Sequence, residues 1–193
     1  GDLAAAARVF WTFKVLGHDA VAVLDGGLVA YAEAGGRLAN GGQSRPPATF
    51  TANLRTELIP SAEDVRAAVD AGVLPVDARS EGEFVGIYTG DKAERPGTIP
   101  GARHLPYDWL AEDGSGKLRS AGALRALFEA RDVDAAGEQI HFCHSGNRAA
   151  LTWFAAYAVL GNDKARLYDG SMLEWARRDD LPIETRIELC KSC

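Results

Sequence analysis

The chain has 193 residues and a formal net charge of -6, with 47% hydrophobic and 25% charged residues. This length suits one domain or a little more, and the composition is ordinary for a globular protein. The absence of any prominent Lys or Arg run argues against nucleic acid and membrane partners, and no apolar run approaches the roughly 18 residues that span a bilayer. Its cysteines, Cys143, Cys190 and Cys193, are too few and too clustered for a disulfide framework, so a reducing compartment, the cytoplasm, is expected.

The first 40 residues repeat a later part of the chain at a constant offset of 144 positions. The shared pattern predicts an amphipathic helix, a Leu-Gly stop, a short strand, an Asp-Gly turn and a second helix. At this offset Cys143 falls before Gly1, so residues 1–40 are expected to be the C-terminal part of a first domain, with 41–57 as a linker. The identical pairs include Ala5/Ala149, Phe10/Phe154, Gly17/Gly161, Asp25/Asp169 and Gly26/Gly170.

Residues 58–185 are predicted to form a complete second domain, followed by a tail at 186–193. Helices and strands alternate along it, which predicts an α/β fold with a mostly parallel central sheet. In such sheets a binding site lies at the carboxyl ends of the strands. The predicted helices are 61–71 with Ser61 as N-cap, one near Gly82, 121–130, 147–160 and 172–177, and the predicted strands are 73–76, one near Ala102, 139–142 and 165–168.

The stretch 139–148, QIHFCHSGNR, places Cys143 at such a strand end. Small and polar residues after the strand let backbone N–H groups converge on one point, and the next helix adds its positive dipole end. This loop is expected to hold an anion, and its N–H groups, with Arg148 and His144, favour the Cys143 thiolate. The alternatives are a buried structural cysteine and a metal ligand, which lacks a second ligand pair of recognisable spacing.

Several further segments resemble the rhodanese family of sulfurtransferases, in the tandem form with an inactive first domain. They cover the whole second domain in the family's order, and residues 1–40 resemble the tail of the first domain. The resemblance implies a rhodanese-like α/β domain with helices flanking the sheet. The matching segments are VDAR at 76–79, EFVG at 83–86, GTIPGA at 97–102, CHSGNR at 143–148, YDGS at 168–171 and DLPIE at 180–184.

The resemblance also implies a double-displacement reaction. The Cys143 thiolate takes the outer sulfur of a donor such as thiosulfate, and an acceptor thiol or cyanide then removes it from the persulfide. A thioredoxin-like reductant is a further expected partner, and neither a metal nor another cofactor is required. The expected substrate-binding residues of the loop, which hold the donor's charge, are His144, Ser145, Gly146, Asn147 and Arg148.

Three other positions bear on the donor and on the fold. Glu83 stands where thiosulfate-handling and 3-mercaptopyruvate-handling members often carry Arg, so Arg95 is a candidate for the missing cation. Asp77 and Arg79 are expected to brace the fold as a buried ion pair. Thr98 replaces a common His at a position that is expected to be structural. Thiosulfate is favoured narrowly, and 3-mercaptopyruvate stays the alternative.

Two rival functions and one weaker motif remain open. Cysteine-dependent phosphatases also use a Cys-to-Arg loop, but they place five residues between the two, whereas four lie between Cys143 and Arg148. A non-catalytic sulfur-carrier or interaction module is the other rival, since fold does not imply function. In the tail, Cys190 and Cys193 form a C-x-x-C pair that would receive sulfur from Cys143 if the tail folds back.

Overall fold

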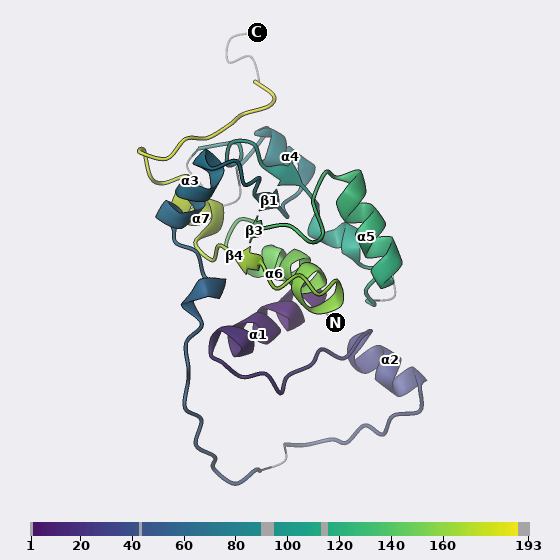
Figure 1. Cartoon of the computed structure of the whole chain (residues 1–193). Coiled ribbons are helices and arrows are strands. Elements are labelled where there is room, and N and C mark those ends of the chain that lie inside the picture. The colour runs from purple at the N-terminus through teal and green to yellow at the C-terminus, as the bar shows by residue number, and fades with distance from the viewer. Residues whose placement is uncertain (1, 43, 90–94, 113–115, 189–193) are drawn as a thin grey trace.

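A computed structural model of the chain describes residues 2–42, 44–89, 95–112 and 116–188 (Figure 1). Short parallel strands alternate with helices in it, as an α/β fold requires. The elements in chain order are α1 (Leu3–Val15), α2 (Gly27–Glu33), η1 (Thr56–Leu58), α3 (Ala62–Asp70), β1 (Val76–Asp77), α4 (Glu81–Val85), β2 (Arg103–His104), η2 (Tyr107–Leu110), α5 (Ala121–Ala130), β3 (Gln139–Phe142), α6 (Asn147–Phe154), η3 (Ala155–Val159), β4 (Ala165–Leu167) and α7 (Ser171–Trp175).

The strands form one parallel sheet in the order β2-β1-β3-β4. β3 lies between β1 and β4, with His141 opposite both Val76 and Leu167. Because all strands run the same way, their carboxyl ends meet at one edge of the sheet, and Cys143 follows β3 at that edge. The predicted α/β class with a parallel sheet is therefore confirmed.

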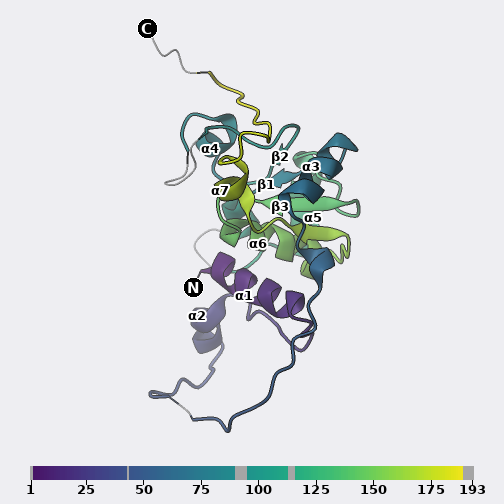
Figure 2. The same ribbon diagram turned by 90° about the vertical axis from the view of Figure 1, so that its left-hand side faces the viewer.

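Side chains alternate across β3 and feed two hydrophobic cores. Ile140 and Phe142 belong to the core on the side of α3 and α7. His141 faces the other side, where it meets Thr152 of α6, and the core there includes Trp153 and residues of α1 and α5. Helices therefore cover both faces of the sheet, as parallel sheets require (Figure 2).

The predicted element bounds are accurate where capping or periodicity is strong. α5 and β3 lie where the sequence placed them, and Ser61 caps α3 through a reciprocal pair of hydrogen bonds with Asp64. The predicted strand at 73–76 is wrong over most of its length, because β1 begins only at Val76. The preceding Pro75 has no N–H to donate to a ladder. The predicted helix at 147–160 is continuous, but its second part, η3, is π-helical.

The N-terminal helix α1 shares a core with α6. Asp2 caps it by accepting hydrogen bonds from two backbone N–H groups, and Phe10 packs edge-on against Phe154 with ring centroids 4.9 Å apart. Both views show α1 alongside α6 (Figures 1 and 2). The residues of α1 that are buried are Ala4, Ala7, Phe10, Trp11 and Val15.

By contrast, α2 buries none of its residues. Leu28 is 64% and Tyr31 41% exposed, whereas Met172 and Trp175, their counterparts at the offset of 144 positions, are fully buried on α7. The same sequence pattern therefore forms a buried helix in α7 and an exposed helix in α2. The division into residues 1–40, linker and second domain stays a prediction.

Within the described parts of the chain, no helix is both long enough and apolar enough to cross a membrane.

Candidate active site

The loop after β3 is tied to the start of α7. The backbone N–H of Cys143 donates to Ser171 Oγ at 3.2 Å, and the Cys143 carbonyl accepts from the N–H of Met172 at 3.1 Å. One residue further, the N–H of Leu173 donates to the His144 carbonyl at 2.9 Å. These bonds hold Cys143, which is only 1% exposed, at the carboxyl edge of the sheet.

Gly146 turns the loop into helix α6. Its φ of +83° lies in the left-handed region, and an added Cβ would meet Asp169 Oδ1 at 2.5 Å and Arg8 Nη1 at 2.7 Å. Glycine alone has the freedom for this turn and leaves room for these neighbours. Gly146 is the N-cap of α6, so the positive end of the helix dipole lies at the loop.

The backbone N–H groups of residues 145–147 have no hydrogen-bond acceptor among the described residues. Unpaired N–H groups are normal at a helix start, and they point toward the space before the helix. Ser145 and Asn147 are exposed, and His144 is half-buried. The predicted loop residues therefore lie together around Cys143, with donors that an anion can accept.

Arg148 is paired with Glu83 of α4 in two parallel hydrogen bonds of 2.7 and 2.8 Å. Glu83 also accepts from the hydroxyl and the backbone N–H of Ser80. Burial raises the pKa of Glu83, but the hydrogen bonds from Arg148 and Ser80 outweigh burial and lower this pKa to about 2. The carboxylate therefore stays ionised at neutral pH and neutralises the cation of the loop.

We expect Glu83→Gln to lower the free energy of unfolding by about 2 kcal/mol at pH 7, because a hydrogen bond between charged groups is lost. The carboxyl pKa is lower in the folded protein than the ordinary value of 4.5. Its stabilising contribution is therefore complete above pH 4.5 and is lost as the pH falls toward about 2. Urea unfolding of both proteins at pH 7 and pH 3 measures this difference.

The matched control for this prediction is Glu63→Gln. Glu63 also pairs with an arginine, Arg178, but its side chain is 67% exposed, so we expect a much smaller change in the free energy of unfolding. Equal losses in Glu83→Gln and Glu63→Gln would contradict a special role for the Glu83 pair.

Asp77 ends β1 and Arg79 lies two residues after it. The two form an ion pair with side chains 0% and 2% exposed. Arg79 Nη2 donates to Asp77 Oδ2 at 2.6 Å and to the carbonyl of Gly97 at 2.8 Å. Thr98 Oγ1 donates to the same Asp77 oxygen at 2.8 Å. Thr98 thus belongs to this buried network, which joins the end of β1 to the segment before β2.

Arg95 lies at the far end of α7 rather than in the Cys143 loop. Its Nε donates to the Ala176 carbonyl at 3.0 Å, and its Nη2 donates to the carbonyls of Arg178 and Leu181 at 2.5 and 3.0 Å. These carbonyls follow the last turn of α7, where helices leave acceptors unpaired. The guanidinium of Arg95 therefore binds backbone carbonyls, and this geometry gives no support to the prediction that Arg95 contacts the donor.

His141 is fully buried two residues before Cys143. Its ring nitrogens lie 3.0 Å from Thr152 Oγ1 and 2.8 Å from Gln139 Oε1. Burial lowers the pKa of His141 to about 3, so the ring is neutral at pH 7. No group of three or more His, Cys, Asp and Glu in the described residues could hold a metal ion. Cys190 and Cys193 lie outside the described residues.

The ion pair beside the loop involves two residues that the sequence did not predict as site residues. Arg8 of α1 reaches Asp169, which follows β4, with its Nη1 2.5 Å from Asp169 Oδ1. A pocket of about 500 Å³ is lined by both residues, by Ser145 and by Arg177. Asp169 was part of the YDGS segment, but its pairing across 161 positions carried no local signal.

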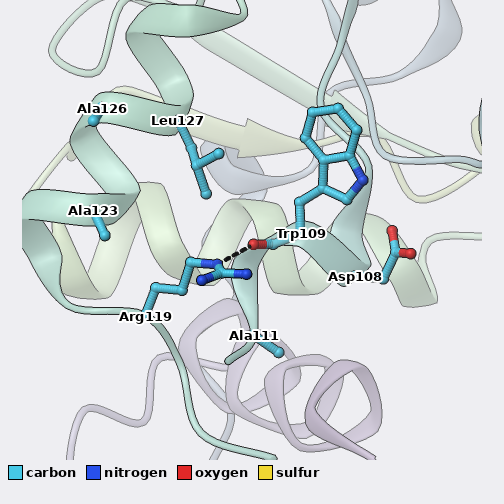
Figure 3. A pocket seen from close by; sticks show the side chains of 7 residues that line it. All are labelled: Asp108, Trp109, Ala111, Arg119, Ala123, Ala126 and Leu127. Carbon is cyan, nitrogen blue, oxygen red and sulfur yellow. Dashed lines mark hydrogen bonds between the residues drawn. The ribbon is translucent and has the colours of Figure 1, made fainter. Parts of the chain in front are cut away.

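A second pocket, of about 680 Å³, lies between η2 and α5 (Figure 3). Trp109 and Arg119 line it, and Arg119 Nε donates to the Trp109 carbonyl at 2.7 Å. None of the predicted site residues lines this pocket, so its position gives no support to a role in the chemistry of Cys143.

Comparison with known proteins supports the same reading of the fold. The profile of the Rhodanese-like domain matches residues 61–178. The chain is 34% identical over 186 residues to "Putative thiosulfate sulfurtransferase 1" of Mycobacterium bovis, covering 93% of this chain and 66% of that protein. It is 34% identical over 190 residues to human 3-mercaptopyruvate sulfurtransferase, covering 95% of this chain and 63% of that protein.

A solved structure gives the same fold. SseA of Escherichia coli, a 3-mercaptopyruvate sulfotransferase, superposes with a TM-score of 0.77 at 30% identity, covering 89% of this chain and 63% of SseA. The chain thus spans just under two thirds of the length of these relatives. Since the profile match covers more than half of the chain, the chain belongs to the Rhodanese-like domain family.

Proposed function

We propose that this protein is a sulfurtransferase that moves sulfane sulfur from thiosulfate to cyanide or a thiol through a persulfide on Cys143. The observation that carries this proposal is the position of Cys143, two residues before the first of three successive backbone N–H groups, those of residues 145–147, that have no acceptor among the described residues. The names of the relatives support the same reaction class. 3-Mercaptopyruvate is the alternative donor.

In the first step the Cys143 thiolate attacks the outer sulfur of thiosulfate. A new S–S bond forms to Cys143 as the S–S bond of thiosulfate breaks, and sulfite leaves with the bonding electron pair. The negative charge passes from the attacking thiolate to the leaving sulfite, and the outer sulfur remains as a persulfide. The N–H groups of residues 145–147 and the start of α6 stabilise the anions throughout.

In the second step the acceptor attacks the outer sulfur of the persulfide. Cyanide takes this sulfur and leaves as thiocyanate, while a thiolate acceptor leaves as a new persulfide. The electron pair of the broken S–S bond returns to Cys143 and regenerates its thiolate, so no cofactor enters the balance. Splitting the transfer into two displacements is covalent catalysis.

Because Arg148 pairs with Glu83, its positive charge contributes less to binding the donor than that of an unpaired arginine would. Arg148 uses both terminal nitrogens on the Glu83 carboxylate, so its charge is largely balanced before a donor binds. Backbone N–H groups and the helix dipole then supply most of the attraction for the donor. Backbone N–H groups can bind a compact anion such as thiosulfate. 3-Mercaptopyruvate also carries a carboxylate, which would need a cationic side chain as its partner, so thiosulfate is proposed as the donor ahead of it.

The test is the intact mass of the protein after exposure to thiosulfate or to 3-mercaptopyruvate, followed by cyanide. We expect a gain of one sulfur atom that cyanide reverses, located on the tryptic peptide 132–148, which contains Cys143 and no other cysteine. The donor that reacts faster identifies the substrate. No gain with either donor would overturn the proposal, and Cys143-dependent hydrolysis of an aryl phosphate would replace it with phosphatase chemistry.

A further inference from the structure

Arg8 and Asp169 form an ion pair that rests on the Cys143 loop. Arg8 Nη1 lies 2.5 Å from Asp169 Oδ1, and the two side chains are 27% and 41% exposed. Both atoms lie so close to Gly146 that an added Cβ there would meet them at 2.7 and 2.5 Å. The carboxylate of Asp169 is therefore one of the nearest charges to the loop that would hold an anion.

The pocket over this pair opens beside the loop. Ser145, Gly170 and Leu173 line it together with Arg8 and Asp169, and its volume is about 500 Å³. A donor that approaches the loop through this pocket passes the Asp169 carboxylate. An unpaired carboxylate there would repel an anion, because two like charges a short distance apart near a protein surface destabilise each other.

Apolar packing contacts, apart from the Arg8 ion pair, join α1 to α6. The helix buries Phe10 and Trp11 in the core that it shares with α6, where Phe10 packs against Trp153 and Phe154. The guanidinium of Arg8 stacks over Trp11 at 4.4 Å from the ring centroid, and its one ion-pair partner in the described residues is Asp169. The positive charge of Arg8 can therefore neutralise the Asp169 carboxylate beside the Cys143 loop.

We infer that Arg8 is a positioning residue of the active site, which neutralises Asp169 and so keeps the Cys143 loop receptive to anionic reactants. Arg8 belongs to α1 and lies outside residues 61–178, the part matched by the Rhodanese-like domain. One determinant of selectivity for anions therefore comes from a helix that precedes that domain. This inference deepens the proposed function, because it concerns the approach of the donor to Cys143.

The test compares two alkylating reagents of similar size that differ in charge: iodoacetate is an anion and iodoacetamide is neutral. Alkylation of Cys143 is followed on the tryptic peptide 132–148, and the ratio of the two rates reports the electrostatic environment of the sulfur. In Arg8→Met we expect the iodoacetate rate to fall about tenfold relative to the iodoacetamide rate, because Asp169 loses its counter-charge. This readout does not depend on sulfur transfer.

Three further variants separate the charge from the packing of α1. Arg8→Met combined with Asp169→Asn removes both charges and should restore the wild-type ratio to within about threefold. Asp169→Asn alone leaves Arg8 without its counter-charge and should shift the ratio the other way, toward iodoacetate. Lys14→Met is the matched control, because Lys14 is also on α1 and also pairs with an aspartate, Asp19, at 2.9 Å; its ratio should stay unchanged.

If the proposed function holds, Arg8→Met should also raise the KM for thiosulfate about tenfold with a smaller change in kcat, as expected when anion binding alone is weakened. An unchanged reagent ratio in Arg8→Met would overturn the inference, and so would an equal fall in Arg8→Met and in the double variant. If Arg8→Met does not fold, Asp169→Asn alone tests the inference: a shift of the ratio toward iodoacetate supports it, and an unchanged ratio overturns it. A wild-type protein that forms no persulfide but shows these ratios would contradict the proposed function and leave the inference standing.

Discussion

Replacing Cys143 by serine should reduce sulfur transfer from thiosulfate to cyanide at least about a thousandfold. A serine hydroxyl is a weak nucleophile without an adjacent base, and it cannot form the persulfide that divides the reaction into two displacements. The loop and its N–H groups remain in the variant, so residual activity would measure binding without the nucleophile. Thiocyanate production under steady-state conditions is the measurement.

The structure makes Cys143→Ser a clean replacement. Cys143 is 1% exposed, and exchange of sulfur for oxygen removes little volume, so the variant should show the circular dichroism spectrum of the wild type. The control replaces Cys190 and Cys193 together by serine and leaves Cys143 as the remaining thiol. Turnover in Cys143→Ser within tenfold of the wild type would contradict the proposal, and lost turnover in the control would indicate that the tail accepts sulfur.

Replacing Arg79 by methionine should lower the free energy of unfolding by about 3–5 kcal/mol, the cost of leaving one buried charge without its partner. Asp77 would remain, 0% exposed, without its guanidinium partner, although Thr98 would still donate a hydrogen bond to it. Total stabilities of single domains are about 5–15 kcal/mol. The variant should therefore unfold at a much lower urea concentration than the wild type, which equilibrium unfolding measures.

Two further variants show whether burial causes this loss. Arg66→Met breaks an ion pair with Asp70 on the surface of α3, where the side chains are 41% and 61% exposed, and should cost less than about 1 kcal/mol. Arg79→Met combined with Asp77→Asn removes both buried charges and should lose less than the sum of the single changes. A loss in Arg79→Met no greater than in Arg66→Met would refute the argument.

Local patterns in the sequence predicted much of the fold and the place of Cys143 in it. The bounds of α5 and β3 follow from periodicity, and the Cys143 loop follows from a strand, small residues and a helix in direct succession. These features arise within about ten residues of one another. The apolar residues before Val76 predict an earlier start of β1 than the structure has, because Pro75 has no N–H to donate to a strand ladder.

The electrostatics of the site could not be predicted in this way. Arg148 pairs with Glu83 across 65 positions and Arg8 with Asp169 across 161. Such pairs depend on which helices the sheet brings together, and no spacing in the sequence reports that. The position of Arg95 in a polar loop predicts a cation for the donor, whereas in the folded chain Arg95 donates to the backbone carbonyls that follow α7.

The contact between α1 and α6 bears on how this protein should be divided for laboratory work. A fragment cut to residues 61–178 would keep the sheet and Cys143 but would uncover Trp153 and Phe154, which α1 covers through Phe10. An apolar surface of that kind promotes aggregation. The part that the Rhodanese-like domain profile matches, residues 61–178, therefore lacks a helix that covers its core, and an expression fragment should include α1.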